Sequence, residues 1–127
     1  MLFLNEEHKE EWAAAIEKAG ALTDYDTVKG DFAASLFVIT GIPGLYSRAE
    51  KHVHEGWLDI LAMVDGLGLS TGERILVGLA GNLYNGGFGD LCAPMDIIAY
   101  CDSEMVKLAA RAILMRKQTV NINTVFE

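Results

Sequence analysis

The chain has 127 residues, of which 51% are hydrophobic and 22% are charged, and its formal net charge is −8 at pH 7. This composition is typical of one folded domain and excludes a disordered chain. A strongly acidic chain lacks the basic surface that neutralises phosphates, so the composition also argues against nucleic-acid binding.

Three features of the sequence predict a cytoplasmic protein. The first residues, M-L-F-L-N-E-E-H, lack the basic segment of a secretion signal. No apolar run reaches the roughly 18–20 residues that a membrane-spanning helix needs, so no membrane association is expected. Cys92 and Cys101 form no CxxC pair, and we interpret them as reduced thiols rather than a disulfide framework.

A first helix is predicted from the capping residue Asn5 to Gly20. Two acids follow Asn5, where the helix dipole favours negative charge, and glycine is a common helix end. His8 and Trp12 lie on the apolar face of this helix, so His8 is interpreted first as a half-buried, hydrogen-bonded side chain.

Further helices are predicted at residues 27–40, where the start could also lie near residue 24, and at about 44–53. Gly41 is expected to end the first of these, and Pro43 suits the first turn of the second. The segment 54–69 indicates only one or two helical turns, because glycines interrupt its apolar pattern.

The fifteen residues Ile75–Gly89 carry no charge. A helix without a charged face is normally buried, so a central helix is predicted at about residues 71–85. Ser70 and Glu73 have the spacing of a capping box at its start, and Gly86 is expected to end it in the left-handed conformation.

A short helix from Pro94 to Tyr100 and a last helix capped by Asp102 or Ser103 complete the prediction. The expected inner face of the last helix consists of Met105, Leu108, Ala109, Ala112 and Ile113. The tail 118–127 alternates apolar and polar residues, but no second strand is expected. It is therefore predicted to be frayed or docked on a partner. The sequence thus predicts a single all-α domain over residues 1–127, with five to seven helices around the central one.

Three pieces of the sequence resemble a family of small bacterial proteins classed as a domain of unknown function. They are Phe3-Leu4-Asn5 with Glu7-His8, Ala34–Gly41 followed by Leu45-Tyr46, and Leu79–Gly86. The resemblance covers about two-thirds of the chain, and Asn-Leu-Tyr-Asn-Gly is its most specific part, whereas residues 53–69 depart from the pattern. It implies a compact, cytoplasmic bacterial protein associated with mobile elements, and it implies no activity, cofactor or catalytic residue.

Asn82 and Asn85 are the most unusual residues of the central helix, because they stand where apolar side chains are the default. Buried carboxamides need hydrogen-bond partners, which neighbouring backbone groups or a ligand can supply. As candidate binding residues we take these two with Tyr84, Asp90 and His8. The structural alternative is that the carboxamides bond neighbouring helix ends or loop carbonyls, while Gly78 and Gly81 let another helix approach closely.

No pattern predicts a metal site, a cofactor or a catalytic group. His52 and His54 are two residues apart, so on a helix their side chains diverge, and no HExxH motif is present. The cysteines lack a neighbouring histidine, and no serine stands in a GxSxG context.

The leading hypothesis is a helical protein–protein interaction or regulatory module without catalytic activity, whose partner is another protein or a second copy of the chain. A sharper version is an acidic inhibitor that mimics nucleic acid, which requires the acids of residues 1–31 and 50–102 to converge on one face. The alternative is a small enzyme or ligand-binding protein with a polar pocket around Asn82, Tyr84 and Asn85.

Overall fold

Helix α2 (Gly30–Gly41) lies at the centre of the molecule because it is apolar on every side. In the computed structural model, which describes residues 2–126, every residue from Phe32 to Gly41 is buried. Such a helix is stable only when neighbours cover its whole circumference. Three long helices do so: α5 (Thr71–Asn85), which packs on it most extensively, α7 (Ser103–Lys117) and α1 (Glu6–Ala19).

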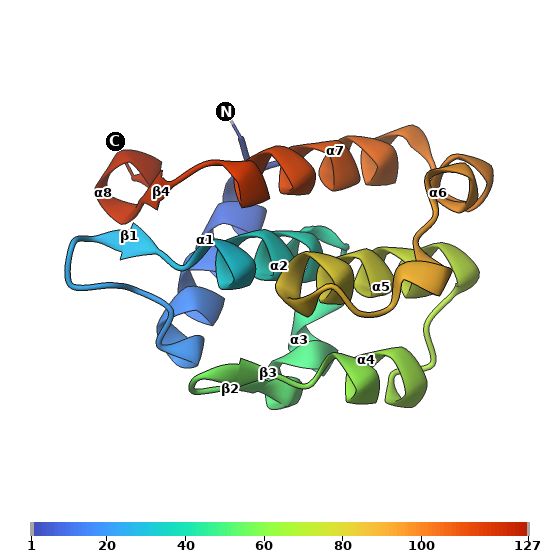
Figure 1. Cartoon of the computed structure of the whole chain (residues 1–127), viewed down its shortest axis with the longest axis horizontal. Helices are drawn as coiled ribbons and strands as arrows, with labels where there is room; N and C mark the ends of the chain where they lie inside the picture. Colours follow the sequence, from blue (N-terminus) through green and yellow to red (C-terminus); the bar gives the residue numbers. More distant parts are fainter. Residues whose placement is uncertain (1, 127) are drawn as a thin grey trace.

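Shorter elements complete the domain (Figure 1). In this view α7 runs along the top with α6 at its N-terminal end, α2 and α5 lie below it, and the β2–β3 hairpin lies at the bottom with α4. The short elements are β1 (Thr27–Val28), α3 (Tyr46–Ala49), η1 (Glu50–His52), β2 (Val53–His54), β3 (Trp57–Leu58), α4 (Ile60–Gly66), η2 (Gly89–Leu91), α6 (Pro94–Tyr100), β4 (Val120–Asn121) and α8 (Ile122–Val125).

The all-α prediction is confirmed, with eight α-helices in residues 2–126 where five to seven were expected. Two of the eight, α3 and α8, have only four residues. The long helix predicted at 71–85 has these bounds, but α2 rather than α5 has the most extensive contacts. None of the helices described is both long and apolar enough to cross a membrane.

Several predicted helix ends are confirmed by their hydrogen bonds. Asn5 accepts from the amide of His8, and Asp102 accepts from that of Met105. Both halves of the Ser70–Glu73 capping box are present. Gly20 and Gly86 follow their helices in the left-handed conformation, with φ of 64° and 82°.

Two predicted helices differ from the structure in their bounds. The helix predicted from residue 24 or 27 begins only at Gly30, because Thr27 and Val28 form β1. The helix predicted at about 44–53 is divided into α3 and η1.

The C-terminal tail has a partner strand within the chain itself, which the sequence did not indicate. Strand β4 pairs antiparallel with β1, so that Val120 lies opposite Val28 and Asn121 opposite Thr27. The amide of Ile122 also donates to the carbonyl of Asp26 at 2.8 Å. The described part of the tail, residues 118–126, is therefore docked on its own domain rather than frayed or held by a partner, and residue 127 lies outside the described residues.

The predicted inner face of α7 is confirmed except at Ile113. Leu108, Ala109 and Ala112 are buried and Met105 packs partly buried against the core, but Met115 is buried whereas Ile113 is 51% exposed. Apolar residues occur on two sides of this helix, so its periodicity did not show where the buried side ends.

Candidate functional site

Asn82 and Asn85 both bond to the turn that follows α5. The Asn82 carboxamide donates to the carbonyl oxygens of Gly86 and Gly87 at 3.2 and 2.9 Å. The Asn85 side-chain oxygen accepts from the amide of Gly87 at 2.9 Å. These contacts correspond to the structural alternative, in which the two carboxamides bond to the protein's own backbone.

Tyr84 stabilises a different part of the fold. Its hydroxyl oxygen accepts from the amide of Leu58 on β3 at 3.3 Å, and its ring packs edge-to-face on Phe32 of α2 with centroids 5.4 Å apart. The side chain therefore connects α5 to the hairpin and to the central helix.

Gly78 and Gly81 let the chain after α5 fold back tightly over that helix. A β-carbon at Gly78 would lie 2.8 Å from Leu91 of η2. A β-carbon at Gly81 would lie 2.5 Å from the ring of Phe88 and 2.9 Å from Ile60 of α4. Phe88 itself has φ of 60°, a left-handed conformation that is unusual for an aromatic residue. The close approach expected from these glycines is thus confirmed, and the approaching segments are η2 and the start of α4.

His8 lies in the core, on the face of α1 that packs against α2. Its Nε2 donates to the carbonyl oxygen of Phe37 at 2.8 Å, while its Nδ1 accepts from the amide of Leu4 at 3.1 Å. An acceptor at Nδ1 requires the neutral ring with its proton on Nε2. Burial lowers the pKa of His8 below 6.5 despite the favourable bond to Phe37, and the nearby Arg111 lowers it further. His8 is therefore a neutral structural histidine with both nitrogens in use.

The structure does not bring the five candidate residues together. His8 contacts the rings of Phe3 and Phe37. Asp90 is exposed on η2. Four prominent hollows in the surface of residues 2–126 have no contribution from Asn82, Tyr84, Asn85 or Asp90, and His8 lines only one of them, of about 110 Å³. The predicted polar pocket at the end of α5 has no support from this geometry.

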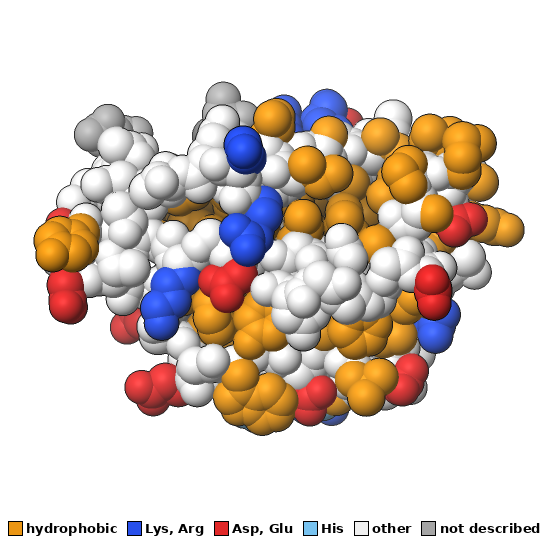
Figure 2. All heavy atoms as spheres, viewed as in Figure 1, with side chains coloured by type: hydrophobic (Ala, Val, Ile, Leu, Met, Phe, Trp, Pro, Cys, Tyr) orange, Lys and Arg blue, Asp and Glu red, His pale blue; other side chains and the backbone are white. Residues whose placement is uncertain are grey.

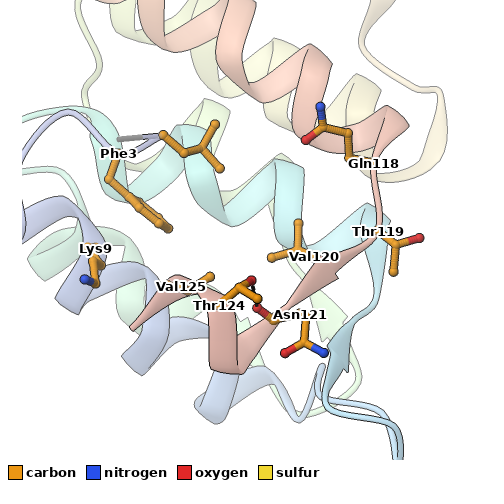
Figure 3. A pocket seen from close by; sticks show the side chains of 9 residues that line it. Phe3, Lys9, Gln118, Thr119, Val120, Asn121, Thr124 and Val125 are labelled. Atoms are coloured by element: carbon orange, nitrogen blue, oxygen red, sulfur yellow. Dashed lines mark hydrogen bonds between the residues drawn. The ribbon is translucent and has the colours of Figure 1, made fainter. Parts of the chain in front are cut away.

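A hollow of about 420 Å³ lies between the N-terminal segment and the tail (Figure 3). Phe3 and Val120 lie on opposite sides of it, and Lys9 is its one charged lining residue in the described chain. The Lys9 ammonium lies 5.1 Å from the ring centroid of Phe126 and 3.9 Å from a carboxylate oxygen of Glu6. The Lys9 ammonium thus already interacts with an aromatic ring and a carboxylate of the protein itself.

The cysteines are poor nucleophiles in this setting. Burial raises the pKa of both thiols, and the neighbouring Asp102 raises that of Cys101 further. Within residues 2–126, no three side chains of His, Cys, Asp or Glu are placed to hold a metal ion. His54 instead stacks on the ring of Trp57 at 4.4 Å between centroids.

The most unusual surface feature is a set of apolar side chains on α6 and α7. Figure 2 shows hydrophobic side chains over the region of α6 and along α7, at the upper right of the view. On α6 the side chains of Met95, Ile98 and Tyr100 are 60–70% exposed. On α7, Ile113 and Leu114 are 51% and 57% exposed.

Helix α7 consequently has two apolar sides. One is the buried side that packs on α2. The other contains half-buried Val106 with exposed Ala110 and Ile113, at intervals of four and three residues. We call this side, together with Leu114 and the exposed residues Met95, Ile98 and Tyr100 of α6, the α6–α7 face. The sequence contains one sign of this face. The segment 103–117 has more apolar residues than a helix with a single buried side requires.

The comparisons with known proteins assign no family to the chain. It matches no family model, and no curated protein or solved structure was found to be similar to it. The resemblance of Leu79–Gly86 to an uncharacterised bacterial family therefore stays a prediction. The function proposed below is based on the surface of the protein.

Proposed function

We propose that this protein is a helical protein–protein interaction module and that its partner docks on the α6–α7 face. The observation that supports this is the exposure of five large apolar side chains on two consecutive helices. The outer side of a surface helix is normally polar, and exposed apolar patches are typical of interaction sites.

The chemistry of this face suits a binding surface. Met95 and Tyr100 belong to residue types that are enriched in protein interfaces. Complete burial of a fully exposed isoleucine or leucine side chain contributes about 1.5–3 kcal/mol. Ile113 and Leu114 are 51% and 57% exposed, so each can still contribute about half of this as an anchor. Bonds to the protein's own backbone already occupy the side-chain nitrogen of Asn82 and the side-chain oxygen of Asn85, two of the groups that a small-molecule site there would use. The interaction hypothesis is thus the better supported of the two.

We also propose that the module acts in the cytoplasm. Cys92 and Cys101 are both free, and each thiol faces a backbone carbonyl rather than the other sulfur. Two unpaired thiols suit a reducing compartment.

Site-specific photocrosslinking in the host cell tests the proposed interaction. A photoreactive amino acid at position 113 is expected to trap a discrete protein adduct. The matched control places the same group at Lys51, an exposed residue of η1 near the β2–β3 hairpin, where no such adduct is expected. Identical weak patterns at the two positions would contradict the proposal.

A further inference from the structure

We infer that residues 118–126 form a strap that opens as one unit while the rest of the domain stays folded. In the closed state the strap covers apolar surface between the N-terminal segment, α1 and β1, and opening uncovers it. The strap lies away from the α6–α7 face, so this inference does not depend on the proposed function. It is supported by the shallow burial of the strap, the hollows on both of its sides and the position of its hydrogen bonds.

The strap is attached to the domain by little apolar area. None of its residues is buried. Val120, Ile122 and Val125 are half-buried against the core, whereas Phe126 is 51% exposed beside the ammonium of Lys9. Ordering a segment costs conformational entropy at every residue, and burial of apolar surface is the main effect that offsets this cost. A segment that buries so little is held far more weakly than α2, whose side chains are buried throughout.

Hollows border the strap on both sides. One, of about 420 Å³, lies between the strap and Phe3 of the N-terminal segment (Figure 3). The other, of about 470 Å³, lies between Ile122 and Phe126 of the strap and Ile16 of α1. Protein interiors are normally close-packed, with few voids larger than a water molecule. The strap instead contacts the domain between two hollows, so it can lift without disrupting a packed core.

The hairpin that receives the strap is folded by its own hydrogen bonds. The amide of Thr23 donates to the carbonyl of Thr27 at 2.8 Å, and the amide of Lys29 donates to that of Ala21 at 2.9 Å. Neither bond involves the strap. The edge of β1 therefore keeps its conformation when the strap leaves it.

Asp26 of this hairpin makes two of the bonds that close the strap. Its carbonyl oxygen accepts from the amide of Ile122 at 2.8 Å, and its carboxylate accepts from the side-chain nitrogen of Asn123 at 3.2 Å. Asp26 is exposed, so water can replace both bonds at a small net cost. At the other end, Gln118 and Thr119 are exposed directly after α7 and can serve as the hinge.

The residues that the strap covers are apolar, and we call them its floor. Phe3 and Ile16 line the two hollows, and Val28 lies directly opposite Val120. In the closed state these three side chains are only 2–4% exposed. Any ligand of the floor, and any strand that pairs with the edge of β1, has to displace the strap first. The strap is thus a built-in competitor for this surface.

Native-state hydrogen exchange of the full chain tests the opening. The amide of Ile122 is expected to exchange at least about 100-fold more readily than that of Leu36 in α2, relative to their intrinsic rates. It should also be insensitive to about 1 M urea, because opening exposes little surface. Exchange of Ile122 that is as slow and as urea-dependent as that of Leu36 would overturn the inference, because the strap would then open only on global unfolding. Exchange at the rate of an unstructured peptide would overturn it too, because the strap would then not be closed.

Two asparagine variants test whether the strap opens independently. Asn123→Ala removes the side-chain bond to Asp26 and is expected to accelerate exchange at Ile122 about three- to tenfold. The matched control is Asn85→Ala, because Asn85 is also exposed and bonded but holds the turn after α5. That turn stays closed when the strap opens, so this variant should accelerate exchange at Leu36 and leave Ile122 unchanged. Acceleration of both amides by Asn85→Ala to the same extent would overturn independent opening.

Thiol labelling tests whether opening uncovers the floor. Val28→Cys and Val38→Cys are compared in full chains that also contain Cys92→Ser and Cys101→Ser, and circular dichroism establishes that they are folded. Val28 and Val38 are 4% and 0% exposed, but only Val28 lies opposite Val120 of the strap. The thiol at position 28 is expected to react at least about tenfold faster than the thiol at position 38, which requires global unfolding. Equally slow labelling of the two would contradict the uncovering of the floor.

Discussion

At the residue scale, His8 is the side chain whose protonation state matters most for the fold. Its ring bridges the N-terminal segment, through the amide of Leu4, and the central helix, through the carbonyl of Phe37. A proton on Nδ1 would put two donors face to face and place a charge in the core near Arg111. The folded state therefore favours the neutral ring, whereas the unfolded chain protonates near pH 6.5.

The stability of the protein should accordingly fall in mild acid. Because the folded-state pKa of His8 is lowered, its contribution is fully present above pH 6.5 and is lost as the pH falls from there toward the folded-state pKa, by at most about 1.4 kcal/mol per pH unit. Urea unfolding between pH 7.5 and 5 measures this loss. In His8→Gln we expect stability lower by about 1–3 kcal/mol at pH 7.5 and a shallower decline toward pH 5.

Trp12→Phe is the matched control for this prediction. Trp12 also donates a buried hydrogen bond to α2, at 3.0 Å to the carbonyl of Ala33, but its side chain does not titrate. The variant should lose stability by a similar amount at every pH. An equally steep decline in His8→Gln and in the wild type would show that other groups cause it.

At the element scale, the clearest case is the turn of the chain over α5. Gly81 lies in a helix interior, where alanine is normally more stable than glycine by about 1 kcal/mol. Here the added methyl group would meet Phe88 and Ile60 at 2.5 and 2.9 Å, closer than packed atoms tolerate. The need for close packing therefore outweighs helix propensity at this position.

Gly81→Ala is expected to lower the free energy of unfolding by about 1–3 kcal/mol, the usual cost of overpacking. The control is Gly66→Ala at the end of α4, where a β-carbon would meet nothing within 4 Å. That variant should be neutral or slightly stabilising. Thermal unfolding compares the two, and a Gly81→Ala protein as stable as Gly66→Ala would contradict the packing argument.

The N-terminal ends of α1, α5 and α7 were predictable from the sequence because their causes are local. Asn5, Ser70 and Asp102 cap helices through bonds that span only three residues. The exposed side of α7 and the β1–β4 pairing were not predictable in this way. Both depend on contacts between segments far apart in the chain, such as Val28 with Val120, and periodicity contains no information on which segments meet.

The candidate site was likewise only partly predictable from the sequence. That Asn82 and Asn85 need partners followed from their chemistry, but the identity of the partners depended on the turn at Gly86 and Gly87. The sequence therefore showed correctly that Asn82 and Asn85 are unusual. It left open whether their hydrogen-bond partner is a ligand or the protein's own backbone. The α6–α7 face was missed because Ile113 was assigned to the core.

At the scale of the whole molecule, Arg111 joins α7 to the start of the chain. Its guanidinium donates to the carbonyl oxygens of Leu2 and Phe3 at 2.9 and 3.3 Å, across more than a hundred residues of sequence. Phe3 in turn packs against the rings of Trp12 and Phe37. One side chain thus helps to hold the N-terminal segment over the core.

Arg111→Met should release that segment while keeping the apolar stem of the side chain. We expect a loss of about 1.5–3 kcal/mol in stability, the range for hydrogen bonds to charged groups, and faster hydrogen exchange at the amide of Leu4. Arg74→Met, at an exposed arginine of α5, is the control and should change stability by less than about 0.5 kcal/mol. Unchanged exchange at Leu4 in Arg111→Met would show that the segment is held by its packing alone.

The position of α2 has a consequence for the newly made chain on the ribosome. This helix is complete once Gly41 has been synthesised, but α5 and α7, which cover most of it, end only at Asn85 and Lys117. At about 5–20 residues per second, roughly 4–15 seconds pass between Gly41 and Lys117. Until Asn85 has been made, the most apolar helix of the protein has only α1 among its long neighbours, and it lacks α7 for the whole interval. Nascent chains that stop before α7 should therefore need a chaperone to stay in solution.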